Sequence, residues 1–151
     1  MSMKFRWPLP PTLLALAIAG MLALHFLLPL GRVVPFPWNC LGAPLILFGI
    51  IWNLWADRLF KRHRTTVKPH LQPTSLVSAG PFRLSRHPMY LGMIAIALGL
   101  AVVLGTLTAM LVALVFATLL AVKFVPMEER LMEQTFGDAW KDYRTRTRRW
   151  L

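Results

Sequence analysis

The longest apolar run of the chain extends from Met89 to Val125, 37 residues in which Lys123 is the only charged side chain. About 20 helical residues cross the hydrocarbon core of a bilayer, so a single helix would be far too long. Gly105 and Thr106 divide the run into two segments of suitable length. We therefore expect two membrane-spanning helices that fold back on each other at this point.

Two shorter apolar runs precede this hairpin. The first extends from Leu13 to Leu30, and the second from Leu41 to Leu54 and on towards Phe60, with an aromatic cluster at Trp52 and Trp55. The chain is 151 residues long, which suits one domain. We expect an all-α, polytopic membrane protein with about four transmembrane helices. Its single membrane domain, residues 1–151, divides into two N-terminal spans (1–60) and a C-terminal half (61–151).

A cleaved signal peptide is an alternative for the first run. Lys4 and Arg6 precede it, and the segment 17–19 is similar to a cleavage site. The apolar run continues past that segment to Leu30, and this favours a retained helix.

The composition excludes an ordinary soluble domain. Hydrophobic residues make up 56% of the chain and the formal charge is +11, whereas soluble domains are about 45–50% apolar. A strongly basic chain raises the question of nucleic acid, but here the charges fall between apolar runs, as in membrane proteins. We expect membrane lipids, and no nucleic acid, as partners.

The charges also predict the topology. Of the 17 Lys and Arg residues, seven lie within 58–86 and seven from Lys123 onward, whereas Arg32 alone lies between the first two runs. The positive-inside rule then places the 58–86 loop, the C-terminal tail and both termini in the cytoplasm. In a bacterium this membrane would be the inner one. His25 falls in the outer part of the first span, where we expect a neutral ring bonded to a neighbouring helix.

The segment after Pro126 has a different pattern. Four residues recur at helical spacing opposite three charged ones: Met132, Phe136, Trp140 and Tyr143 against Glu129, Glu133 and Lys141. Gly137 predicts a helix stop and Asp138 a new N-cap. We expect one helix that continues from the fourth span, a break, then a short second helix and a basic tail, TRTRRW, that faces anionic headgroups.

The stretch SRHPMYLG, residues 85–92, places polar side chains at the start of the hairpin. Proline is tolerated at the first helical position, and the residue before it is pushed out of helical geometry. Pro88 therefore predicts the helix start, with His87 in the preceding loop. Free N–H groups at a helix start favour an anion, and Arg86 adds a forked donor. An anion site and simple anchoring to headgroups are equally compatible with this spacing.

Glu128 and Glu129 lie at the other end of the predicted hairpin, so they would meet Arg86 and His87. The pair could form surface salt bridges, for example to Arg130, or could face a cation or a ribose hydroxyl pair. A carboxylate beside an anion site would suit a zwitterionic cofactor with an amino-acid end. The sequence indicates no metal site, because it lacks a His/Cys cluster.

Two motifs, RHPxY and EE…FGxxWxxY, flank the hairpin in this order. Together, SLVSAGPFRLSRHPMYLG and EERLMEQTFGDAWKDYRTRTRRW resemble the isoprenylcysteine carboxyl methyltransferase and phospholipid methyltransferase family of small integral-membrane enzymes. The resemblance covers roughly Thr65 to Trp150.

The resemblance implies S-adenosylmethionine as methyl donor and a lipid or lipidated acceptor, such as an isoprenylcysteine carboxylate or a phospholipid amine. Arg86, His87, Glu128 and Glu129 would then be the catalytic candidates. By matching position, the implied cofactor contacts are Leu76, Val77, Phe82, His87, Pro88, Met89, Tyr90 and Glu129.

The chain departs from the family pattern at two positions. Phe82 stands where tyrosine is common, and Val125 where eukaryotic relatives carry an arginine thought to face the substrate; Lys123 or Arg130 could replace it. A nicotinamide-dependent membrane reductase of related fold, with its phosphate site at the arginines within 83–86, and a non-catalytic membrane protein remain as alternatives.

Overall fold

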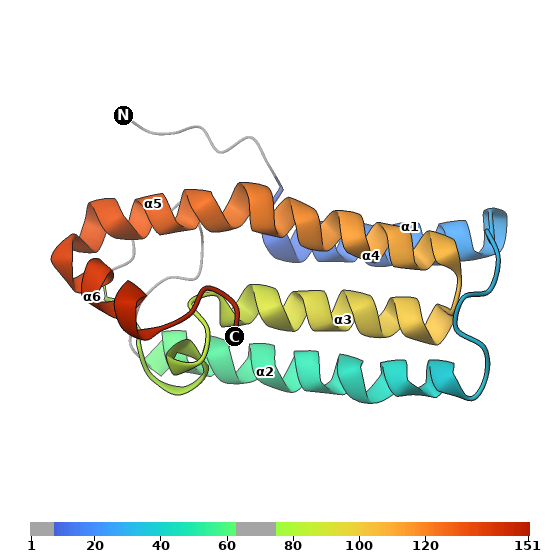
Figure 1. The fold of residues 1–151 in the computed structure, drawn as a ribbon, viewed down its shortest axis with the longest axis horizontal. Coiled ribbons are helices and arrows are strands. Elements are labelled where there is room, and N and C mark those ends of the chain that lie inside the picture. The colour runs from blue at the N-terminus through green and yellow to red at the C-terminus, as the bar shows by residue number, and fades with distance from the viewer. Residues whose placement is uncertain (1–7, 63–74) are drawn as a thin grey trace.

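The computed structural model describes residues 8–62 and 75–151, and within these ranges the regular structure is helical (Figure 1). The all-α prediction is therefore confirmed. The expected charges at Lys4, Arg6, Arg64 and Lys68 lie outside the described residues. So does Thr65, at the start of the family resemblance.

Helix α1 (Pro10–Leu27) and helix α2 (Gly42–Arg62) form the two N-terminal spans. The α1 helix begins three residues earlier than its apolar run, because Pro10 is tolerated in a first helical turn. It ends before Pro29, which disfavours helical geometry at the residue that precedes it. A short 3-10 helix, η1 (Trp38–Leu41), leads into α2.

The predicted hairpin is present. Helix α3 (Pro88–Leu104) ends at Gly105, whose φ of 67° is left-handed, and helix α4 (Leu107–Leu119) follows. The amides of Val33 and Val34 donate to the Gly105 carbonyl at 2.7 and 3.1 Å, so the two loops at this end of the bundle are joined. His25 Nδ1 lies 3.4 Å from Thr106 Oγ1, in agreement with the expected bond to a neighbouring helix.

The α4 helix continues through a π-helical turn, η3 (Leu120–Phe124), into helix α5 (Val125–Phe136). Pro126 accounts for the wider turn, since it has no N–H and its ring clashes with the carbonyl four residues earlier. Gly137, with φ of 50°, ends α5 and is the N-cap of α6 (Asp138–Arg146). The predicted break is confirmed, but Asp138 is the first helical residue rather than the cap.

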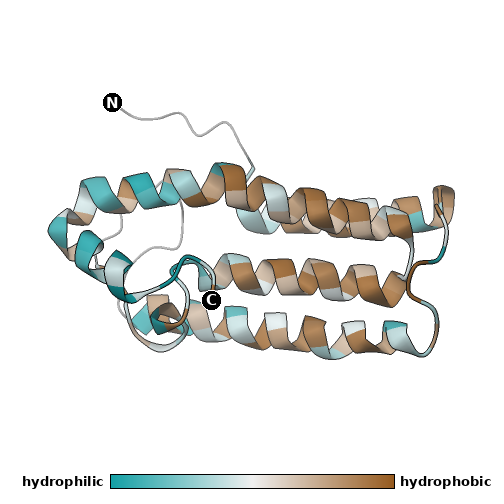
Figure 2. Ribbon diagram, viewed as in Figure 1, coloured by the Kyte–Doolittle hydropathy of each residue, from teal (hydrophilic) through white to brown (hydrophobic). Residues whose placement is uncertain are grey.

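The bundle has one apolar and one polar end (Figure 2). Among the described residues, three helical segments are long and apolar enough to cross a membrane: Pro10–Leu27, Trp38–Arg62 and Leu107–Phe136. The α3 helix is shorter, at 17 residues, and apolar throughout. Large apolar side chains such as Leu47, Ile51, Leu114 and Val115 remain exposed, as expected for surfaces that contact lipid.

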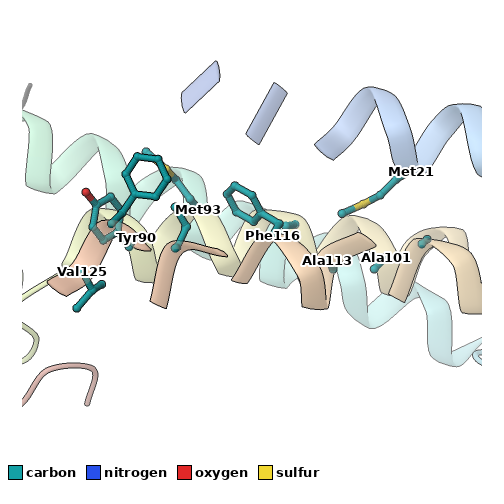
Figure 3. Close-up of a cluster of buried hydrophobic side chains, with 11 residues drawn as sticks. Met21, Tyr90, Met93, Ala101, Ala113, Phe116 and Val125 are labelled. Atoms are coloured by element: carbon teal, nitrogen blue, oxygen red, sulfur yellow. The ribbon is translucent and has the colours of Figure 1, made fainter. Parts of the chain in front are cut away.

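Small residues let the helices approach closely. A Cβ at Gly49 would lie 2.5 Å from the Gly92 carbonyl oxygen, and one at Gly42 would overlap the Gly99 carbonyl. Such contacts are typical of membrane helix pairs. The main core lies between α1, α3 and α4 and includes Ala101, Ala113, Phe116 and Met21 (Figure 3). The loop before α3, the helices α5 and α6 and the C-terminal tail meet at the polar end of this core and carry the residues of the candidate site.

Candidate functional site

The start of α3 is shaped by Ser85 and Pro88. His87 is the N-cap residue and Pro88 is the first helical residue, as predicted. The Ser85 hydroxyl, fully buried, accepts the His87 N–H at 3.1 Å and donates to the Arg149 carbonyl at 3.1 Å. The backbone of this loop is therefore held from both sides, and His87 is 4% exposed.

The two glutamates of α5 meet this loop. Glu129 Oε1 accepts a hydrogen bond from Arg86 Nη1 at 2.8 Å and lies 3.3 Å from His87 Nε2. Glu128 Oε2 lies 3.4 Å from His87 Nδ1, an ion-pair distance that lacks hydrogen-bond geometry. The anion at Arg86 and His87 is thus Glu129 itself. Of the two alternatives for the glutamate pair, ion pairs with arginines are present, and among the described residues they involve Arg86 and Arg149 rather than Arg130.

Arg149 completes this cluster, and the sequence did not predict its role. Its Nη2 lies 2.7 Å from Glu129 Oε2 and its Nε 3.2 Å from Oε1. The Arg86 amide donates to the Arg148 carbonyl at 2.9 Å, and the Trp150 ring lies 6.3 Å from the His87 ring. The tail thus folds back over the start of α3, where Arg149 binds Glu129, and the expectation that the tail faces headgroups stays a prediction.

The charges of α5 change the protonation of His87. Burial alone would lower the pKa of His87, but the contacts with Glu128 and Glu129 outweigh burial and raise it above the ordinary value of 6.5. The pKa of Arg149 is raised by its hydrogen bonds to Glu129. Burial lowers the pKa of Arg86 despite the charge of Glu129, although a guanidinium remains charged in a protein.

A pocket of about 360 Å³, part of it open to solvent, lies beside this cluster. Its walls come from the end of α2, the loop before α3, and helices α5 and α6. The lining residues are Phe60, Ser75, Leu76, Val77, Phe82, Arg86, His87, Glu128, Met132, Trp140 and Tyr143. Its lining mixes apolar and polar side chains, as small-molecule sites do.

Three side chains of this lining hold buried nitrogen atoms without a hydrogen-bond partner. Within the described residues, these atoms are Arg86 Nε, His87 Nδ1 and Trp140 Nε1. The other two unpartnered buried side-chain atoms among the described residues belong to Trp52 and Asn53, which do not line the pocket. Because buried polar groups are nearly always paired, the three beside the pocket are candidate contacts for a polar ligand. By contrast, the Tyr143 hydroxyl donates to the Phe82 carbonyl at 2.6 Å, and burial raises the pKa of Tyr143 to about 12.

The structure brings together six of the residues predicted from sequence at the pocket wall: Leu76, Val77, Phe82, Arg86, His87 and Glu128. The other four lie behind the wall. Pro88 is fully buried, Met89 packs against the Phe60–Phe82 cluster, Tyr90 stacks on the His87 ring at 5.7 Å, and Glu129 binds the two arginines.

Sequence reasoning missed Phe60 and did not assign Trp140 or Met132 to the site. The expected apolar face of α5 and α6 is present, because Trp140 and Tyr143 are buried and Met132 lines the pocket. Glu129, placed on the opposite face, is instead 8% exposed. The signal for Trp140 was its position in the FGxxWxxY motif, whereas nothing in the spacing of Phe60 connects it to this motif.

Val125, which stands where eukaryotic relatives carry a substrate-facing arginine, has no access to solvent or to the pocket. Val125 is fully buried in the main core, where no charged side chain would fit. Lys123 and Arg130 are both exposed. Neither side chain lines this pocket, and the replacement of that arginine by one of them stays a prediction.

Comparison with known proteins agrees with this geometry. A family model described as phospholipid methyltransferase matches residues 38–139, about two thirds of the chain. The match extends from η1 to the start of α6 and includes both glutamates and the loop before α3. No curated protein matches the chain.

Proposed function

Because the chain belongs to the phospholipid methyltransferase family, and is therefore a membrane methyltransferase, we propose that it transfers a methyl group from S-adenosylmethionine to a lipid-like acceptor. The observation that carries this proposal is the set of unpartnered nitrogens of Arg86, His87 and Trp140 around one pocket. S-adenosylmethionine has carboxylate, ribose and adenine acceptors for the donors of Arg86 and Trp140, and its sulfonium supplies an activated methyl.

The exposure and ion pairs of the two glutamates suggest that they have different roles. The Glu128 side chain is 24% exposed and lines the pocket, whereas that of Glu129 is 11% exposed and is bound by two arginines. We assign Glu128 to the positive end of the cofactor. Glu129 then holds Arg86 and His87 in place, and this role replaces the ribose contact that the family resemblance implied.

The same charges favour one class of acceptor over another. A carboxylate acceptor would need a free cation, but Arg86, the one Lys or Arg among the described lining residues, is already bound to Glu129. An amine acceptor needs a base that removes its proton before it attacks. With its proton on Nε2, toward Glu129, neutral His87 can take that role at Nδ1, which then accepts the amine proton and is not a donor to the cofactor. This pattern favours a phospholipid amine over an isoprenylcysteine carboxylate.

The membrane orientation is also part of the proposal. The polar end carries exposed basic side chains from four elements, among them Lys61, Arg83, Arg130 and Arg144, whereas Arg32 lies at the opposite end. The positive-inside rule then places the pocket in the cytoplasm, next to anionic headgroups. Labelling of single cysteines at 61 and 32 in intact cells tests this orientation, with Cys40 replaced by serine.

Incubation of the purified protein with methyl-labelled S-adenosylmethionine and a total lipid extract tests the function. Label in a phospholipid amine supports the proposal, and label in a prenylated cysteine methyl ester identifies the other acceptor. Calorimetry with NADPH tests the reductase alternative. Binding of NADPH without S-adenosylmethionine would contradict the proposal, and binding of neither would favour a non-catalytic protein.

A further inference from the structure

The C-terminal segment 147–150 forms a strap across the start of α3. Thr147 is buried, and the carbonyls of Arg148 and Arg149 accept hydrogen bonds from the Arg86 amide and the Ser85 hydroxyl. Trp150 packs against the main core. The strap therefore touches the loop that carries Arg86 and His87 through its backbone as well as its side chains.

Arg149 fixes the rotation of the Glu129 carboxylate. Oε1 of Glu129 is contacted by Arg86, His87 and Arg149, whereas the one hydrogen bond to Oε2 within the described residues comes from Arg149 Nη2. A guanidinium that bonds to both oxygens of a carboxylate restricts its orientation, which a single point charge does not. Without Arg149, the carboxylate would keep only the contacts at Oε1.

The orientation of Glu129 in turn determines that of His87. The contact between His87 Nε2 and Oε1 turns one edge of the imidazole to Glu129 and leaves Nδ1 facing Glu128, the preceding residue of α5. The ring is also stacked on Tyr90, with an angle of 8° between the planes. A rotated Glu129 would release both the ring edge and the Arg86 guanidinium that line the pocket.

We infer that Arg149 is a positioning residue of the methyltransferase site, which acts through Glu129 to hold Arg86 and His87 in place. It does not line the pocket, and it lies beyond the segment 38–139 that the family model matches. This inference deepens the proposed function, because the side chains it concerns line the proposed cofactor pocket.

Three full-length variants in lipid nanodiscs test the inference by their affinity for S-adenosylmethionine. Arg149→Gln removes the guanidinium that bonds to both oxygens of Glu129, and Arg149→Lys keeps the charge without this two-point contact. Arg148→Gln is the control, because the one side-chain hydrogen bond of Arg148 among the described residues goes to the Leu151 carbonyl at 3.4 Å. We expect affinity for S-adenosylmethionine to fall about tenfold in Arg149→Gln. Arg149→Lys should recover part of it, and Arg148→Gln should match the wild type.

A second measurement does not depend on methyl transfer. In protein labelled with ¹⁵N at its four histidines, NMR follows the protonation of His87, which faces Glu128, Glu129, Arg86, Tyr90 and Trp150. If Arg149 positions Glu129, Arg149→Gln lets the carboxylate turn away, and the titration midpoint of His87 falls. In a Glu129→Gln background, the same substitution should produce no further change.

The sign of this shift decides the question. If Arg149 acted only through its charge, its removal would raise the titration midpoint of His87, because the negative charge of Glu129 would then be less neutralised. A raised or unchanged midpoint in Arg149→Gln would overturn the inference, and so would a fall that persists in the Glu129→Gln background. If Arg149→Gln does not fold, Arg149→Lys gives the same test. Failure of methyl transfer with a lowered midpoint would count against the proposed function alone.

Discussion

Arg149 and Glu129 form a two-point ion pair, with 2.7 Å between Nη2 and Oε2 and 3.2 Å between Nε and Oε1. The pair joins the C-terminal strap to α5, directly behind the pocket wall formed by Arg86 and His87. Glu129 is buried, whereas the Arg149 side chain is 46% exposed, so removal of Arg149 would leave a buried carboxylate with less compensation for its charge. The stability of the polar end and the geometry of the pocket therefore depend on the same contacts.

The protonation of His87 makes stability depend on pH. Its pKa is raised in the folded protein by Glu128 and Glu129, which outweigh burial, so the folded state binds the proton more tightly than the unfolded state does. The contribution of His87 to stability is then fully present below about pH 6.5 and is lost as the pH rises through the higher folded pKa. Melting temperatures of wild type and His87→Gln should differ most at low pH and converge at high pH. A constant difference would contradict the assignment.

The indole of Trp140 offers a test of the ligand contact alone. Trp140→Phe removes Nε1, which has no hydrogen-bond partner among the described residues, and keeps an aromatic ring. We expect a small change in melting temperature and a loss of S-adenosylmethionine affinity of about threefold to tenfold, as for one neutral hydrogen bond. Trp55→Phe is the matched control, because Trp55 is exposed and does not line the pocket. Equal affinity in the wild type and both variants would exclude Trp140 Nε1 as a donor to the cofactor.

The contact between α2 and α3 predicts a steric effect on stability. Gly49→Val should destabilise the protein by about 1–3 kcal/mol, because its Cβ would lie 2.5 Å from a backbone carbonyl oxygen of α3. Gly20→Ala is the control, since no atom lies within 4 Å of a Cβ there and alanine favours a helix. Thermal unfolding in one detergent measures both variants. A tolerated Gly49→Val would contradict the close packing of these helices.

The sequence predicted the helices and the loop of the site because these depend on local chemistry. Hydrophobic length predicted the spans, the left-handed Gly105 the hairpin turn, and Pro88 the start of α3. Helix ends were less certain, as the earlier start of α1 and the cap at Gly137 illustrate.

The tertiary contacts of the site were less accessible to sequence reasoning. The tail TRTRR holds three arginines, and only the path of the chain over α3 decides that Arg149 binds Glu129. Phe60 reaches the pocket because α2 packs along α3, a relationship that no motif spacing encodes. The π-helical turn before Pro126 likewise depends on a clash within the helix, and it precedes the two glutamates that meet His87.

Calorimetric titration of S-adenosylmethionine into the wild type, His87→Ala, Glu129→Gln and the control Glu133→Gln tests the central claim most directly. Glu133 is an exposed carboxylate on the same helix. We predict that the wild type and Glu133→Gln bind with equal affinity, and that His87→Ala and Glu129→Gln each bind at least about tenfold more weakly. Unchanged affinity in both site variants would contradict the location of the cofactor pocket.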